Sequence, residues 1–166
     1  MKKQTMILFL KQFIKDFLFC LNHKITLEIN YNHTVQQMID ECNFNRVEIG
    51  KSRYILGEEF LGKEVVIEGK LFTFHDYYSA TKAVKKMKRK GYEPANLYEL
   101  LAFTKAKPEF YKKYVVAAIG DYVEKPLYDF WAPIVLGNDS IKALRSDRWC
   151  SGYLEGNGIA CLGVKR

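Results

Sequence analysis

The chain has 166 residues, of which 48% are hydrophobic and 14% aromatic, and its formal net charge is +7. This composition excludes an intrinsically disordered chain, and the length suits one compact domain with or without an appended segment. The positive charge permits binding to an anionic partner without indicating one.

The cysteines indicate neither a zinc site nor a disulfide framework. Cys20, Cys42, Cys150 and Cys161 form no CxxC or CxxxC pair, which is the spacing that would point to either. We therefore expect a reducing compartment, cytoplasmic by default, and neither a bound metal nor a cofactor.

Residues 6–21 predict an amphipathic helix. Phe9, Phe13, Phe17 and Leu21 stand four apart, while charged residues between positions 11 and 16 interrupt the apolar run. No small-residue cleavage site follows, as a signal peptide requires, and the run is too short to be a transmembrane segment. We expect this helix to pack on its own domain or on a second copy in a homo-oligomer, with binding to a membrane surface as the alternative.

Residues 24–74 predict strands on both sides of a short helix. Residues 24–32 alternate apolar and polar side chains, as a strand does. Thr34 with Gln37 forms a capping box at the start of a helix. Residues 45–62 predict no particular element, and residues 64–74 predict a hairpin that turns at Gly69 and Lys70.

Two longer helices follow in the middle of the chain. The first runs from about Ser79 to Lys90 and ends before Gly91, which fits the left-handed position after a helix. The second begins at Asn96, which forms a capping box with Glu99. Residues 114–120 and 133–137 then predict short strands separated by long loops. Helices followed by short strands indicate an α+β fold.

The basic run KAVKKMKRK (82–90) has two interpretations. Its outward face carries Lys82, Lys85, Lys86 and Arg89, with the apolar positions on the opposite side. A solvated helix face with cations near the helix C-terminus is the simpler interpretation. A phosphate-binding surface is the alternative, although no nucleic-acid-binding motif accompanies the run.

The sequence contains no recognisable catalytic motif. His23, His33 and His75 are isolated from one another, and no GxSxG, P-loop or GxGxxG pattern occurs. His75 precedes Asp76, but adjacent strand residues point to opposite faces, which favours a turn or a helix cap over an acid–base pair. The segment 136–166 is instead rich in Gly, Asn, Ser, Tyr, Trp and Arg, the residue types of adaptable recognition surfaces.

Two stretches carry a resemblance to a known family. GYEPANLYE (91–99) resembles the Gly-Tyr-x-Pro-Ala-[Thr/Asn]-x-x-Glu stretch of the C-type lectin fold, in the variant shared by formylglycine-generating enzymes and the variable proteins of diversity-generating retroelements. LGVKR (162–166) is similar to the strand that closes that domain. The resemblance implies an α+β, C-type lectin-like domain over residues 33–166, with the helix and strand of residues 1–32 packed on it or contributing to it. It also implies that the helices from Ser79 and Asn96 flank a small sheet whose first and last strands lie near each other.

The chain departs from the enzyme and from the calcium-dependent lectins of this fold. The surroundings of Cys150 and Cys161 do not match the active site of the formylglycine-generating enzymes. The EPAN sequence (93–96) has an additional alanine compared with the lectin Glu-Pro-Asn, and GND (137–139) lacks the tryptophan of Trp-Asn-Asp. We therefore expect a non-enzymatic binding protein. A sulfatase-modifying oxidase that uses Cys150 and Cys161, and a basic nucleic-acid-binding module, are the alternatives.

The resemblance to the variable proteins implies a ligand-binding display protein. Its C-terminal region, about 125–166, would be rewritten by adenine-directed mutagenesis and would bind a protein or glycan ligand. Asparagine codons with replaced adenines cannot encode Trp, Lys or Glu, which makes Trp149, Lys142 and Glu155 constant positions. We expect Trp149, Cys161, Leu162 and Val164 to be buried support. The expected ligand-binding residues are Tyr128, Asp129, Asp139, Ser146, Asp147, Arg148, Ser151, Tyr153 and Asn157.

Overall fold

The computed structural model describes residues 24–50, 58–74, 79–112, 114–120, 123–125, 129–148 and 158–166. The predicted N-terminal helix, His23, His75, Asp76 and Trp149 lie outside these residues. In chain order the elements are β1 (Ile25–Asn30), α2 (Val35–Glu41), β2 (Arg46–Glu48), η2 (Glu58–Phe60), β3 (Glu64–Phe74), α3 (Ala80–Arg89), β4 (Glu93–Pro94), α4 (Leu97–Ala106), η3 (Phe110–Lys112), β5 (Tyr114–Ala117), β6 (Val123–Lys125), β7 (Asp129–Gly137), β8 (Lys142–Arg148) and β9 (Gly158–Lys165). The predicted α+β class is confirmed.

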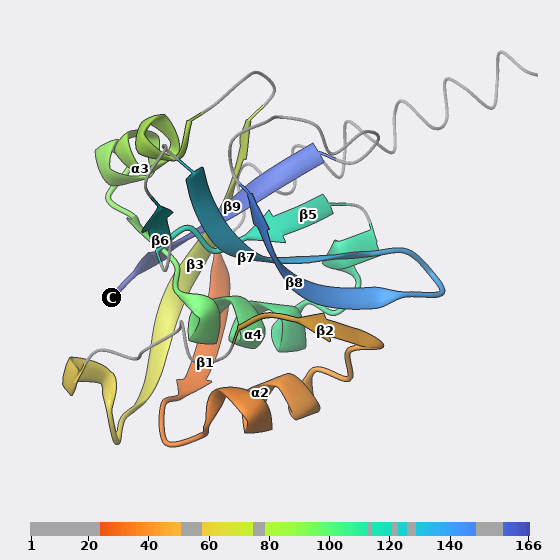
Figure 1. The fold of residues 1–166 in the computed structure, drawn as a ribbon. Helices are drawn as coiled ribbons and strands as arrows, with labels where there is room; N and C mark the ends of the chain where they lie inside the picture. Colours follow the sequence, from red (N-terminus) through yellow and green to blue (C-terminus); the bar gives the residue numbers. More distant parts are fainter. Residues whose placement is uncertain are drawn as a thin grey trace, which may run out of the picture.

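The strands of the described residues form one sheet in the order β1-β3-β9-β5-β7-β8-β2, with β4 beside β9 and β6 beside β7 (Figure 1). The pairs β5–β9 and β2–β8 are parallel, and the others are antiparallel. β1 and β9 lie on either side of β3, so the first and last strands are near each other as expected. The sheet has nine strands in the described residues and is therefore larger than the small one predicted.

Helices cover both faces of this sheet (Figure 1). Leu71 of β3 and Leu162 of β9 are buried in one hydrophobic cluster with α2 and α4. The next residue in β3, Phe72, and the preceding one in β9, Cys161, point to the other face and pack in a second cluster with α3. The central strands are therefore buried on both sides, and β9 lies in the middle of the molecule.

The helix boundaries agree with the capping signals. Thr34 and Gln37 form a complete capping box at α2, and Asn96 and Glu99 form one at α4. Ser79 caps α3, whose buried residues are Ala80, Ala83 and Met87. Gly91 has a φ of 75°, as expected for the residue that ends this helix. No helix in the described part of the chain is long and apolar enough to cross a membrane.

The predicted hairpin at Gly69 and Lys70 is wrong. Residues 64–74 form one continuous strand, β3, which pairs with β1 on one side and β9 on the other. A Cβ added at Gly69 would lie 2.8 Å from Leu27 Cδ1 and 3.5 Å from Leu162 Cδ1. The glycine is present because a side chain there would clash with neighbouring strands, and it makes no turn.

Candidate binding surface

The candidate surface is built on the hairpin of β7 and β8. The two strands pair from Trp131↔Arg148 to Gly137↔Lys142. At the turn, the side-chain oxygen of Asn138 accepts hydrogen bonds from the backbone N–H groups of Ser140 (2.8 Å) and Ile141 (3.0 Å). A Cβ at Gly137 would lie 2.0 Å from the carbonyl oxygen of Ile141, so this position excludes a side chain. The turn is thus fixed by its own short-range contacts.

The backbone register places several of the predicted residues at the open end of this hairpin. Asp129 begins β7, while Asp147 and Arg148 end β8 opposite Ala132 and Trp131. The side chains of Asp129, Asp147 and Arg148 lie outside the described part of the structure. Ser146, also in this part of β8, is partly exposed.

Asp139 lies at the other end of the hairpin, in the turn. Its side chain is exposed and forms an ion pair with Lys112 of η3, at 3.2 Å between Lys112 Nζ and Asp139 Oδ1. The structure therefore does not bring Asp139 beside Arg148. The remaining predicted residues lie outside the described residues: Tyr128, Ser151, Tyr153 and Asn157.

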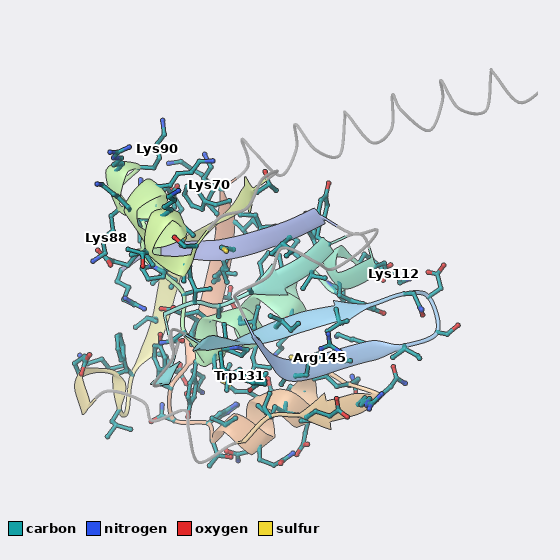
Figure 2. The ribbon with its side chains drawn as sticks, turned by 45° about the horizontal axis from the view of Figure 1, so that its top comes forward. Lys70, Lys88, Lys90, Lys112, Trp131 and Arg145 are labelled. Atoms are coloured by element: carbon teal, nitrogen blue, oxygen red, sulfur yellow. The ribbon has the colours of Figure 1, made fainter. Side chains whose placement is uncertain are left out.

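Two residues of the hairpin were not singled out in the sequence. Trp131 is partly exposed and lies opposite Arg148 in the strand register, and Arg145 lies further along β8 (Figure 2). The aromatic pair FW (130–131) was the available signal, because aromatics are typical of recognition surfaces. Trp131 adds an aromatic side chain near the open end of the hairpin.

The predicted burial is confirmed at three of the positions that we expected to support this surface. Cys161, Leu162 and Val164 of β9 have no exposed surface. Trp149, predicted to be buried with them, lies outside the described residues. β9 is held by β3, β5 and β4, so the chain beyond the hairpin returns to the centre of the sheet.

The two sequence stretches that carry the family resemblance contact each other. β4, within the stretch 91–99, pairs with β9 through Glu93↔Val164 and Pro94↔Gly163. The backbone N–H of Ala95 donates to the carbonyl of Leu162 at 3.0 Å. Two stretches that are more than sixty residues apart in the chain therefore form a single structural unit.

A buried polar cluster closes this unit. Glu99 has no exposed surface and accepts hydrogen bonds from Arg166 Nε at 2.9 Å and Nη2 at 3.1 Å. It also caps α4 at the backbone N–H of Asn96 and accepts from the hydroxyl of Tyr31 at 3.3 Å. Burial, together with the negative charge of Glu99, raises the pKa of Tyr31 above its ordinary value. This cluster fixes the position of α4 against the end of β9.

The described titratable groups form no recognisable catalytic arrangement. Burial raises the pKa of Cys42 to about 11 and raises the pKa of Cys161 as well, which disfavours the reactive thiolate. Within the described ranges, no three His, Cys, Asp or Glu side chains group closely enough to hold a metal ion. His33 pairs with Glu41 at 2.9 Å on the surface.

Comparison with protein-family models, with curated proteins and with solved structures gives no match for this chain.

Proposed function

We propose that this chain is a ligand-binding display protein with a C-type lectin-like scaffold. Its C-terminal region, about 125–166, carries the recognition surface and is diversified by a retroelement. The observation that carries the proposal is the pairing of β4 with β9. The stretches that resemble the variable proteins are joined by backbone hydrogen bonds, as expected if both belong to one scaffold.

The arrangement of β8 and β9 suits a surface that tolerates substitution. β8 ends at Arg148 in a hairpin with β7, and β9 begins at Gly158 between β3 and β5. The segment 149–157 therefore lies between two paired strands, and the buried residues of those strands are outside the segment. Recognition residues held by a packed scaffold in this way vary at little cost to the core.

A non-enzymatic role agrees with the cysteine chemistry. A sulfatase-modifying oxidase using Cys150 and Cys161 would need Cys161 to reach a substrate and form a thiolate. Cys161 is instead fully buried in the middle strand of the sheet, and its pKa is raised by that burial. An oxidation assay on a cysteine-containing peptide, with copper and oxygen, tests the alternative. Turnover that is lost in Cys150→Ala/Cys161→Ala would overturn the proposed role.

The proposed ligand is a protein or a glycan, bound by aromatic and arginine anchors with small polar residues between them. The N-terminal helix is proposed to join copies into a homo-oligomer, which would raise avidity for a repeated ligand. The proposed compartment is the cytoplasm.

A display library tests the proposed function directly. The nine predicted positions are randomised with NNY codons, which are the codons that replacement of both adenines of an AAY codon produces, and a control library randomises nine positions in β3 and β9. We expect the first library to keep the protease resistance of the parent chain and to yield binders to immobilised proteins or glycans. Loss of protease resistance to the same degree in both libraries would contradict the proposal.

A second test uses the coding DNA. A near-copy of the region encoding residues 125–166, differing at adenines and lying near a reverse transcriptase gene, is expected. Its absence from the complete surrounding genome would remove the retroelement from the proposal while leaving the binding role to the display experiment.

A further inference from the structure

A second charged surface lies on α3, separate from the β7–β8 hairpin. We call it the basic α3 surface, and Figure 2 shows Lys90 at the outer end of this helix and Lys70 beside the helix. Lys70 of β3 lies on the same face of the sheet, because its Nζ is 6.0 Å from the ring centre of Phe72, which packs with Ala83 and Met87 of α3. The surface comprises Lys70, Lys82, Lys85, Lys86, Arg89 and Lys90.

The charge on α3 is unbalanced. Half of its ten residues are Lys or Arg, and none is acidic. Lys82 and Lys85 are three residues apart and Lys85 and Arg89 are four apart, spacings at which side chains on a helix are neighbours and like charges repel. The helix dipole offsets this repulsion only near the C-terminus of α3. An anionic partner would relieve the remaining repulsion.

Two described acids near α3, Glu93 and Glu68, form ion pairs with cations. Glu93 pairs with Lys88 at 3.2 Å. Glu68 pairs with Lys24 at 2.7 Å and with Lys165 at 3.4 Å. None of these three partners, Lys88, Lys24 and Lys165, belongs to the basic α3 surface.

The side chains of the basic α3 surface favour a nucleic-acid duplex over a membrane or a single strand. The apolar side of α3 is buried, with Ala83 and Met87 fully covered, so the helix has no apolar face to insert into a membrane. Its outer face carries no aromatic side chain on which single-stranded bases would stack. A rigid row of cations fits a partner with closely and regularly spaced phosphates, and duplex DNA carries one charge per ~1.7 Å of its axis.

We propose that the basic α3 surface binds the phosphate backbone of a nucleic-acid duplex without regard to base sequence. This role is independent of ligand binding by the β7–β8 hairpin. α3 is about 15 Å long, and about five phosphate contacts would give a plot of log affinity against log salt concentration with a slope of about −4.5.

The test measures fluorescence anisotropy of a labelled duplex DNA of arbitrary sequence with the full chain, between about 50 and 200 mM salt. Lys82→Gln/Lys85→Gln/Arg89→Gln removes three charges from the surface. Arg46→Gln/Lys63→Gln/Lys107→Gln removes three exposed charges elsewhere. Each triple variant lowers the net charge from +7 to +4, since 7 − 3 = 4.

We expect the α3 variant to reduce the steepness of the slope by about 2.7, which is three contacts at 0.9 each, and the control variant to change it by less than about 1. Equal losses in both variants would show that net charge alone causes binding and would overturn the proposal. So would a parent slope shallower than about −2, a measurement that needs no variant. Binding to vesicles of equimolar phosphatidylcholine and phosphatidylserine with no binding to the duplex would assign the surface to a membrane instead.

Discussion

Arg166 donates two hydrogen bonds to the buried carboxylate of Glu99, through Nε to Oε1 at 2.9 Å and through Nη2 to Oε2 at 3.1 Å. The guanidinium also lies over the ring of Phe60 at 5.3 Å. Glu99 lies in the first turn of α4 and Arg166 follows β9, so one ion pair joins the stretches 91–99 and 162–166. A charged group without exposed surface needs such a partner, because burying an unpaired charge is costly.

Arg166→Ala is expected to lower the free energy of unfolding by about 1–3 kcal/mol, because it leaves the buried carboxylate of Glu99 short of donors. Urea denaturation measures the loss. Lys165→Ala is the matched control, since its ion pair with Glu68 is on the surface, and it should lose less. Glu99→Gln/Arg166→Ala should recover part of the loss by removing the buried charge. Equal effects of Arg166→Ala and Lys165→Ala would contradict this view of the ion pair.

Glu68 should make stability depend on pH in the acid range. Hydrogen bonds from Lys24, from the hydroxyl of Tyr92 and from Lys165 lower its pKa from 4.5 to about 2. Because the folded-state pKa lies below the unfolded one, the stabilisation is complete above about pH 4.5 and is lost as the pH falls toward 2. Thermal unfolding from pH 6 to pH 2 (about the range in which carboxylates titrate) should show a shallower acid decline in Glu68→Gln than in the parent. Glu59→Gln, an exposed control, should leave the decline unchanged.

Lys142 is a buried cation held by aromatic rings and a carbonyl. Its Nζ donates to the carbonyl of Cys42 at 2.6 Å and lies 5.0 Å from the ring centre of Phe44 and 5.4 Å from that of Tyr111. Burial lowers its pKa, so the folded state disfavours the charged form. Lys142→Met keeps the aliphatic chain without the charge and should be as stable as the parent or more stable.

The same site gives a contrasting variant. Lys142→Ala removes the aliphatic packing as well as the hydrogen bond, and it should cost about 1–3 kcal/mol. Any advantage of Lys142→Met should shrink as the pH rises toward 10.5, the ordinary pKa of lysine, because the parent then loses its buried charge. Urea denaturation at neutral and alkaline pH measures both effects. A Met variant that is as unstable as the Ala variant would show that the charge itself stabilises the fold.

The sequence predicted the starts of the helices well, because a helix start depends on residues that are close together in the chain. The Thr34–Gln37 and Asn96–Glu99 capping boxes depend only on residues three positions apart. The second role of Glu99, as the partner of Arg166, depends on the tertiary fold and has no local signal. At Gly69 a local signal was misleading. A glycine between two runs of strand-forming residues is typical of a turn, but this glycine is required because a side chain would clash with Leu27 in the neighbouring strand.

The order of the strands in the sheet could not be predicted from the sequence. β9 pairs in parallel with β5 and antiparallel with β3, and both pairings join residues that are far apart in the chain. β2, in the region that predicted no element, pairs with β8 through Val47↔Leu144 although all its residues are exposed. The burial of Cys161, Leu162 and Val164 was predicted because the closing strand of the family fold is apolar. The candidate surface around Asp147 was predicted from composition and resemblance, and composition does not determine which side chains share a face.

The display proposal predicts that the recognition positions tolerate substitution and that the buried positions of β9 do not. Ser146→Ala, Asp147→Ala and Ser151→Ala should each change stability by less than about 0.5 kcal/mol, as surface substitutions do. Leu162→Ala should cost about 2–5 kcal/mol, because Leu162 is fully buried and its loss leaves a cavity beside α4. Val164→Ala, at a second position without exposed surface, should cost less than Leu162→Ala because fewer methyl groups are removed. Thermal melts of these five variants measure the contrast. If Ser146, Asp147 and Ser151 instead prove less tolerant than Leu162, those positions belong to the scaffold and the display surface must lie elsewhere.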